Sequence, residues 1–226
     1  MHYQIKHKGA FPFLEIDLEE GESVKAESDA MLTMSSNIDL RGTMDGGFLR
    51  GLGRKMAGEK LFFQELTAKK GKGKVRLAPS TIGDIETITL DGTYRLLVQK
   101  DGFLAGTNGI QVSTKVQNLV SGMFSGAGFF VVEISGVGDV FLNAFGAIEI
   151  IHLEEGEELI VDNGHLVAWP DYMQPKITKA SKGWISSVTS GESLVCKFQG
   201  EGPVLIQSRN PKAFGDWVGQ FTTQKN

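Results

Sequence analysis

The chain has 226 residues, of which 41% are hydrophobic and 22% charged, and its formal net charge is −4. This length can bury a sizeable core, and the acidic balance gives no whole-chain attraction to nucleic acid, whose binders usually carry a basic excess. Cys196 is the only cysteine, which excludes an intramolecular disulfide.

Residues 1–10 lack the apolar stretch of an export signal. No uncharged apolar run approaches the roughly 20 residues that a membrane-spanning helix needs. We therefore expect a soluble protein in the reducing environment of the cytoplasm, folded as a single domain over residues 1–226.

A glycine-rich basic segment at residues 46–56 sets apolar side chains four residues apart beside three cations. Each glycine costs about 1 kcal/mol in a helix interior, so a helix would form here only when packed on something. An anionic membrane surface is one partner with suitable chemistry, and the protein's own core is the alternative. The candidate binding residues are Phe48, Arg50, Leu52, Arg54 and Lys55.

A second concentration of positive charge lies at residues 69–76, around two glycines. It is interpreted as a solvated hairpin tip, with binding of phosphate or an anionic surface as the alternative. No aromatic residue is interleaved for stacking on bases, so nucleic acid is not expected as a partner.

Glycine is abundant, with 29 residues, and it repeatedly separates short apolar runs. Such punctuation is typical of strands joined by tight turns, and neither 94–99 nor 129–134 has a helical period. The dipeptides Asp91-Gly92, Asp101-Gly102 and Asn163-Gly164 are each predicted to join two antiparallel strands. The run 129–134 is predicted to be a strand buried on both faces.

Two acidic turns repeat one another, at residues 18–22 and 153–157. Their similarity indicates either duplicated β units or a chance recurrence of an acidic turn in a β protein. A small-residue stretch at 121–128 would let a neighbouring chain approach closely, which predicts a homo-oligomer.

The sequence contains few residue patterns that are typical of catalytic sites. His152 and Glu154 are predicted to share one strand face, but no His-x-His pair of a cupin-type metal centre occurs. Cys196 alternates with Leu194 and Phe198 on an apolar face, which predicts a buried, unreactive thiol. We therefore predict no catalytic residue, no metal and no cofactor.

The C-terminal segment has the pattern of an amphipathic helix. Asn210 suits the N-cap and Pro211 the first helical position, and they precede a stripe formed by Phe214, Trp217, Val218 and Phe221. The stripe is expected to close an open end of the β core, and docking on a neighbouring subunit is the alternative.

Several motifs resemble the altered-inheritance-of-mitochondria (mitochondrial biogenesis) family, in its prokaryotic branch. They are the run 46–59, Phe62-Phe63-Gln64-Glu65-Leu66, Leu77-Ala78-Pro79, Gly83-Asp84-Ile85, the run 122–129, Gly138-Asp139-Val140-Phe141-Leu142 and the run 161–169. The resemblance covers residues 43–217. It implies a β-sandwich or shortened double-stranded β-helix similar to the tryptophan RNA-binding attenuation protein. It also implies a cytosolic location for prokaryotic members and a link to inner-membrane organisation for mitochondrial ones, and it offers no catalytic residues to carry over.

Together these features predict an all-β protein with a short C-terminal helix. Its expected role is non-enzymatic binding or scaffolding, as an oligomeric cytosolic assembly in contact with a membrane surface. A cupin-like small-molecule-binding or metal-dependent enzyme, centred on His152 and Glu154, is the alternative.

Overall fold

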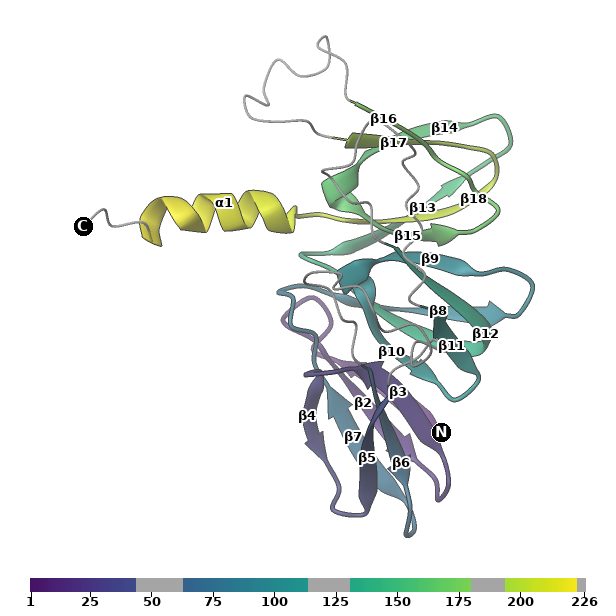
Figure 1. Ribbon diagram of the computed structural model, residues 1–226, viewed down its shortest axis with the longest axis vertical. Coiled ribbons are helices and arrows are strands. Elements are labelled where there is room, and N and C mark those ends of the chain that lie inside the picture. Colours follow the sequence, from purple (N-terminus) through teal and green to yellow (C-terminus); the bar gives the residue numbers. More distant parts are fainter. Residues whose placement is uncertain (44–62, 114–130, 180–193, 223–226) are drawn as a thin grey trace, which may run out of the picture.

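The structure of the protein is a computed structural model, and it describes residues 1–43, 63–113, 131–179 and 194–222. Within those residues the strands form three sheets, and one α-helix follows the last strand (Figure 1). The prediction of an all-β fold with a C-terminal helix is confirmed.

A four-stranded sheet forms the N-terminal end of the molecule. Along β2 (Phe13–Leu18), the apolar residues Leu14, Ile16 and Leu18 alternate with less buried positions, and the two-residue period of a strand puts all three on one buried face. They share a hydrophobic cluster with Val24 and Leu66 of the largest sheet. The order is β1 (His2–Lys6), β2, β7 (Gly73–Leu77) and β4 (Met31–Met34).

The largest sheet runs through the whole molecule. Its order is β13 (Ile148–Leu153), β18 (Gly202–Gln207), β15 (Leu166–Pro170), β9 (Leu96–Gln99), β12 (Val131–Asn143), β10 (Phe103–Thr107), β3 (Ser23–Glu27), β6 (Phe63–Ala68) and β5 (Ile38–Thr43), while β8 (Ile85–Asp91) and β11 (Ile110–Ser113) also pair with β12. A three-stranded sheet of β14 (Glu158–Asp162), β17 (Leu194–Gln199) and β16 (Lys176–Lys179) covers the C-terminal end. Each end of the molecule is thus a pair of sheets packed over its own hydrophobic cluster.

Strand β12 connects the two ends. Residues 140–142 pair with both β8 and β10, and residues 133 and 134 pair with both β9 and β11, so four strands share β12 as a neighbour. Between these two regions, Gly136 and Gly138 have φ values of +106° and +142°. A side chain at Gly136 would collide with the carbonyl oxygen of Gly109, so the strand can pass this point only without one.

The prediction that three glycine turns each close a hairpin is wrong. Strands β8 and β9 do not pair with each other but follow one another along β12, with Asp91 opposite Val137 and Leu96 opposite Ile134. Strand β12 separates β9 from β10, which are joined by a 3-10 turn at Lys100–Gly102. The third turn joins β14 of the small sheet to β15 of the largest one.

The residue types at two of these turns nevertheless act locally as expected. The Asp91 carboxylate accepts the Thr93 backbone N–H at 2.9 Å, and the Asp162 carboxylate accepts that of Gly164 at 2.8 Å. A turn fixes only a few residues, whereas the neighbour of a strand is chosen by the burial of whole faces. The local prediction therefore succeeds where the pairing prediction fails.

The strand predicted at 129–134 is present from Val131, and Val131, Val132 and Ile134 are buried. Residues 129 and 130 lie outside the described part of the chain. The two repeated acidic turns also have matching geometry. In the first, the Glu22 N–H donates to the Glu19 carbonyl at 3.0 Å while the Glu22 carboxylate accepts the Glu19 N–H at 2.9 Å.

In the second acidic turn, the corresponding distances between Glu157 and Glu154 are 3.1 and 2.9 Å. The third position of each turn is a glycine, with φ of +85° and +86°, which is the conformation that a type II turn requires there. Origin from duplicated β units stays a prediction, because similar turns also arise independently.

Candidate functional site

The helix α1 (Pro211–Thr222) begins where the sequence predicts. The Asn210 side-chain oxygen accepts the backbone N–H groups of Lys212 and Ala213 at 2.9 and 3.2 Å, which satisfies two of the free donors of the first turn. On the polar face, the Lys212 ammonium pairs with the Asp216 carboxylate at 2.7 Å, one turn further on.

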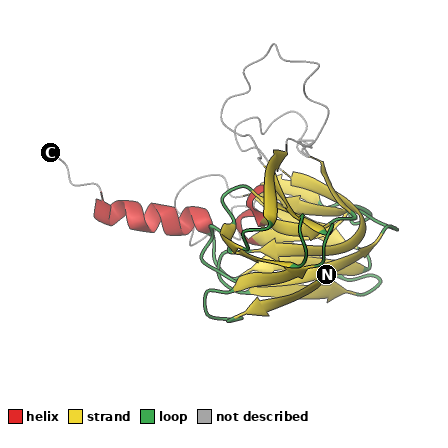
Figure 2. Cartoon of the chain, turned by 90° about the horizontal axis from the view of Figure 1, so that it is seen from below, coloured by secondary structure: helices red, strands yellow, loops and turns green. Residues whose placement is uncertain are grey.

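The apolar stripe of α1 does not close the β core, and this expectation is corrected. The helix projects away from the sheets (Figures 1 and 2) and buries none of its residues. The exposed fractions of the Phe214, Trp217 and Phe221 side chains are 41%, 55% and 69%. The three rings pack on one another in sequence, with centroids 5.9 and 5.2 Å apart. The reason for the difference is that the amphipathic period is the same for a core-facing and a partner-facing helix, so the pattern does not decide which surface the stripe meets.

The base of α1 is anchored to the body. Phe214 contacts Phe145, with ring centroids 5.1 Å apart. The backbone N–H of Arg209 donates to the Phe145 carbonyl at 3.2 Å, and that of Ser208 donates to the Ala147 carbonyl at 2.9 Å. The direction of the helix is therefore fixed by the two residues that precede its cap.

Beside this base the body has a small hollow of about 260 Å³. Phe11 and Ile82 line it, and their exposed fractions are 78% and 53%. Its floor is held by backbone hydrogen bonds, from the Asp84 N–H to the Gly146 carbonyl at 2.8 Å and from the Gly146 N–H to the Ile82 carbonyl at 2.9 Å. The lining residues are Gly9, Ala10, Phe11, Ile82, Gly83, Asp84, Gly146 and Ala147.

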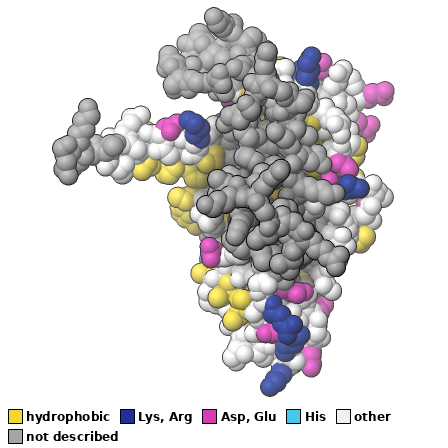
Figure 3. Space-filling view, in the orientation of Figure 1, with side chains coloured by type: hydrophobic (Ala, Val, Ile, Leu, Met, Phe, Trp, Pro, Cys, Tyr) yellow, Lys and Arg dark blue, Asp and Glu magenta, His cyan; other side chains and the backbone are white. Residues whose placement is uncertain are grey.

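The hollow and α1 together form one surface, which we call the corner: Phe11, Ile82 and Phe145 on the body and Phe214, Trp217 and Phe221 on the helix. Phe145 joins the two parts, since it contacts Phe214 and is next in the chain to Gly146 of the hollow. Figure 3 shows apolar side chains along the underside of α1 and on the adjoining flank of the body. Exposed apolar surface of this kind is typical of protein interaction sites.

The sequence identified the helix half of the corner through its period and cap, but not the body half. Phe11 lies in a turn between β1 and β2 with φ of +58°, and Ile82 lies between strands. Neither position lies in a periodic element. Ile82 is brought beside Gly146 by the bridge between Gly83 and Gly146, and Phe11 reaches the hollow on the turn that joins β1 and β2.

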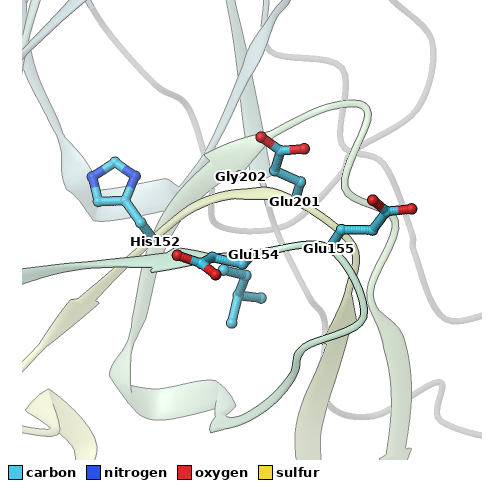
Figure 4. A pocket seen from close by; sticks show the side chains of 6 residues that line it. His152, Glu154, Glu155, Glu201 and Gly202 are labelled. Atoms are coloured by element: carbon cyan, nitrogen blue, oxygen red, sulfur yellow. The ribbon is translucent and has the colours of Figure 1, made fainter.

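A second hollow, of about 450 Å³, contains the predicted pair His152 and Glu154. Both side chains are exposed, and two further carboxylates, Glu155 and Glu201, line the same hollow. Figure 4 shows the carboxylates directed apart rather than toward a common point. Within residues 1–43, 63–113, 131–179 and 194–222, no group of three or more His, Cys, Asp or Glu side chains is arranged to hold a metal ion.

Cys196 lies in β17 opposite Val161, and its side chain is buried with Phe198 and Trp169 in the C-terminal cluster. Burial raises the pKa of the Cys196 thiol to about 12, with a smaller contribution from the negative charge of Asp162. The prediction of a structural rather than a nucleophilic cysteine is confirmed in its burial.

The basic run at 69–76 is a crossing between two sheets and not a hairpin tip, because β6 pairs with β3 and β5 whereas β7 pairs with β2 and β4. Along β7 the cations meet carboxylates of β2. The Glu15 carboxylate lies 2.9 Å from the Lys74 ammonium and 2.7 Å from the Arg76 guanidinium. These hydrogen bonds, with that of Lys74 the larger cause, lower the pKa of Glu15 to about 2.

The predicted binding residues Phe48, Arg50, Leu52, Arg54 and Lys55 lie outside the described residues, as does the small-residue stretch at 121–128. Among the helices that the structure describes, none is long and apolar enough to span a membrane.

Similarity to other proteins covers almost the whole chain. It is 35% identical over 231 residues to an uncharacterized protein of Streptococcus pyogenes serotype M6, covering 98% of this chain and 91% of the relative. An X-ray crystal structure of a Streptococcus pyogenes protein, a structural genomics target, has 32% identity and a TM-score of 0.77, covering 97% of this chain and 99% of that chain. Residues 3–209 match the sequence model of the family described as "Mitochondrial biogenesis AIM24". The chain therefore belongs to the mitochondrial biogenesis AIM24 family, as its motifs suggest.

Proposed function

We propose that this protein is a non-enzymatic binding or scaffolding protein of the cytoplasm, and that it holds its partner through the corner. The observation that carries the proposal is α1, which is anchored at its base by Phe145 and yet leaves three aromatic side chains in solvent. Aromatic residues, tryptophan above all, are enriched among the residues that dominate binding energies.

The stability of α1 supports the same reading. Isolated helices shorter than about 12 to 15 residues are marginal in water even when rich in alanine. This helix has 12 residues and includes Gly215 and Gly219, which together cost roughly 2 kcal/mol relative to alanine. A bound partner would supply the packing that the β core does not.

The second candidate is a cupin-like small-molecule-binding or metal-dependent enzyme at the hollow of His152 and Glu154. In its favour, a volume of about 450 Å³ lies within the roughly 300–1,000 Å³ range of small-molecule pockets. Against it, those pockets are mostly apolar and have convergent polar groups, whereas the four titratable side chains here point in different directions (Figure 4).

Native mass spectrometry of protein purified from its source separates the two functions. A scaffold is expected to appear in a complex that the substitution Trp217→Lys dissociates, with no small ligand or metal retained. A bare chain that carries one metal or ligand, lost in His152→Ala, would contradict the scaffold and support the enzyme.

A further inference from the structure

We propose that the partner held by the corner is a second copy of this chain. In this dimer, α1 of each protomer lies in the corner of the other, against Phe11, Ile82 and Phe145. The inference rests on the proposed function, and it deepens it by naming the partner.

The shape of the corner decides against a flat partner. The aromatic face of α1 and the flank of the body meet at an angle at Phe214 and Phe145 (Figures 1 and 3). A bilayer surface could touch the helix or the flank, but it could not enter the angle between them. A helix about 10 Å across can do so, and it would contact both walls at once.

The charges of the corner also argue against a bilayer as its partner. The ionisable residues of α1 are Lys212 and Asp216, which neutralise one another in an ion pair. The body wall adds one charge of each sign, the carboxylate of Asp84 and the guanidinium of Arg209, whose side chain lies against Gly146. A helix that rests on an anionic bilayer usually has a polar face rich in Lys and Arg, and this surface has no such excess.

The apolar area suits a dimer. From the exposed fractions of its rings and of Ile82, and about 200 Å² for a whole aromatic side chain, the corner exposes roughly 600 Å² of apolar side-chain surface. Two corners facing one another would bury about 1,200 Å², which is the lower end of the range for specific protein interfaces.

A twofold dimer would use both walls of each corner. It would also be closed, so that no third copy is added. Because α1 of the first protomer enters the corner of the second, the twofold axis places α1 of the second in the corner of the first. The two helices would also lie beside one another, with the aromatic stripe of each facing the other. The hollow beside Ile82, at about 260 Å³, is below the usual size of a small-molecule pocket and suits an inserted side chain.

The test uses the full chain and its mass in solution, measured by sedimentation velocity at 1–50 μM, a range chosen on the order of common dimer affinities. The wild type is expected to have twice the chain mass of 24.6 kDa. Phe221→Lys on the helix and Ile82→Glu on the body are each expected to weaken association at least tenfold. The matched control is Gln220→Lys, which adds the same charge on the polar face of the same helix turn and should leave the dimer intact.

Mixing the two variants, Phe221→Lys and Ile82→Glu, makes the test specific. The introduced ammonium group on the helix of one chain would then face the introduced carboxylate on the body of the other in one of the two corners. The mixture is therefore expected to recover a heterodimer, whereas each variant alone associates with itself at least tenfold more weakly than the wild type. A helix that folded back on its own body could not produce this rescue. A circular dichroism spectrum like that of the wild type shows that each variant is folded.

Other occupants of the corner would give distinct results. A monomeric wild type at 50 μM, or a dimer that Phe221→Lys leaves intact, overturns the inference. A monomer that floats with phosphatidylcholine–phosphatidylserine vesicles and loses flotation in Phe221→Lys would assign the corner to a bilayer and also overturn it. If the chain is monomeric but the native complex contains a different protein and depends on Trp217, the second copy is excluded while the scaffolding function stands.

Discussion

Glu27 is the last residue of β3, and its surroundings disfavour the charged form of its carboxyl group. Burial raises its pKa to about 7, with smaller contributions from the negative charges of Asp101 and Asp29. Its usual pKa is 4.5, so the folded state binds the Glu27 proton more tightly than the unfolded state. The stability from this group is complete below about pH 4.5 and is lost as the pH rises through 7.

Replacing Glu27 with Gln is therefore expected to raise the free energy of unfolding at pH 8 and to change it little at pH 4.5. Because the side chain is partly exposed, the gain is on the order of 1 kcal/mol after allowing for solvent screening. Urea unfolding between pH 4.5 and 8 measures it. The control is Glu20→Gln in an exposed turn, and a Glu27→Gln curve parallel to the wild type would contradict the prediction.

The Cys196 thiol gives a second prediction at this scale. With its pKa raised to about 12, the thiolate fraction near pH 8 falls on the order of a thousandfold below that of an ordinary thiol of pKa about 8.5. Reaction with a disulfide reagent such as DTNB should thus be at least a hundredfold slower in the native protein than in 8 M urea, where roughly normal reactivity returns. Equal rates would mean that the cysteine is accessible.

At the scale of the elements, β12 needs glycine at Gly136 and Gly138, where the backbone has positive φ. Gly136→Ala would place a methyl group against the Gly109 carbonyl in a backbone with φ of +106°, where an L-residue is already strained. We expect a loss of about 2 kcal/mol or more in the free energy of unfolding. Gly42→Ala in β5, where a side chain would meet open space, is the matched control and should change stability little. A similar effect of both substitutions would contradict this role of β12.

At this scale, the features that the sequence predicts correctly are those that depend on residues adjacent in the chain. The cap at Asn210, the stripe of α1 and the alternation around Cys196 each depend on a few adjacent residues, and all three are confirmed. The hairpin prediction fails because β8 and β9 find their common partner far along the chain, in β12, roughly 50 and 35 residues further on. A turn dipeptide carries no information about that choice.

At the scale of the molecule, the family and the all-β class could be predicted because motifs and glycine spacing run along the whole chain. The corner could be predicted only in half. Phe214, Trp217 and Phe221 are identifiable by their helical period. Ile82 reaches the corner through the bridge between Gly83 and Gly146, and Phe11 reaches it on an irregular turn between β1 and β2. That the helix stripe faces solvent was also beyond prediction, because amphipathicity is the same for a core-facing and a partner-facing helix.

Membrane contact through residues 46–56 is a prediction of the same scale and is independent of the corner. If Arg50 and Arg54 lie on an anionic surface, each should contribute about 1 kcal/mol of attraction at low salt. The wild type should then float with phosphatidylserine liposomes, and the double substitution Arg50→Glu and Arg54→Glu should abolish flotation.

Lys69→Glu with Lys70→Glu makes the same change of charge in the crossing between β6 and β7, the second basic run. Loss of flotation in this variant alone would assign the membrane contact to that run and contradict the role of residues 46–56. A wild type that stays at the bottom of the gradient at low salt would exclude membrane contact. In that case Phe48→Ala is expected to lower the melting temperature instead, since the segment would then pack on the protein itself.

The position of β12 has a consequence for how such a chain can change over evolution. Four strands from the earlier half of the chain, β8 to β11, all pair with this one later strand, and within the described residues β8 and β11 pair with no other. A gene cut before residue 131 would encode strands without their common neighbour, and a gene begun there would encode that neighbour without its strands. Within the described residues, a cut at β12 would therefore break strand pairs toward both ends of the molecule. Insertions and new sequence can therefore be accommodated most easily at the connections between strands and after the last strand, where α1 is attached.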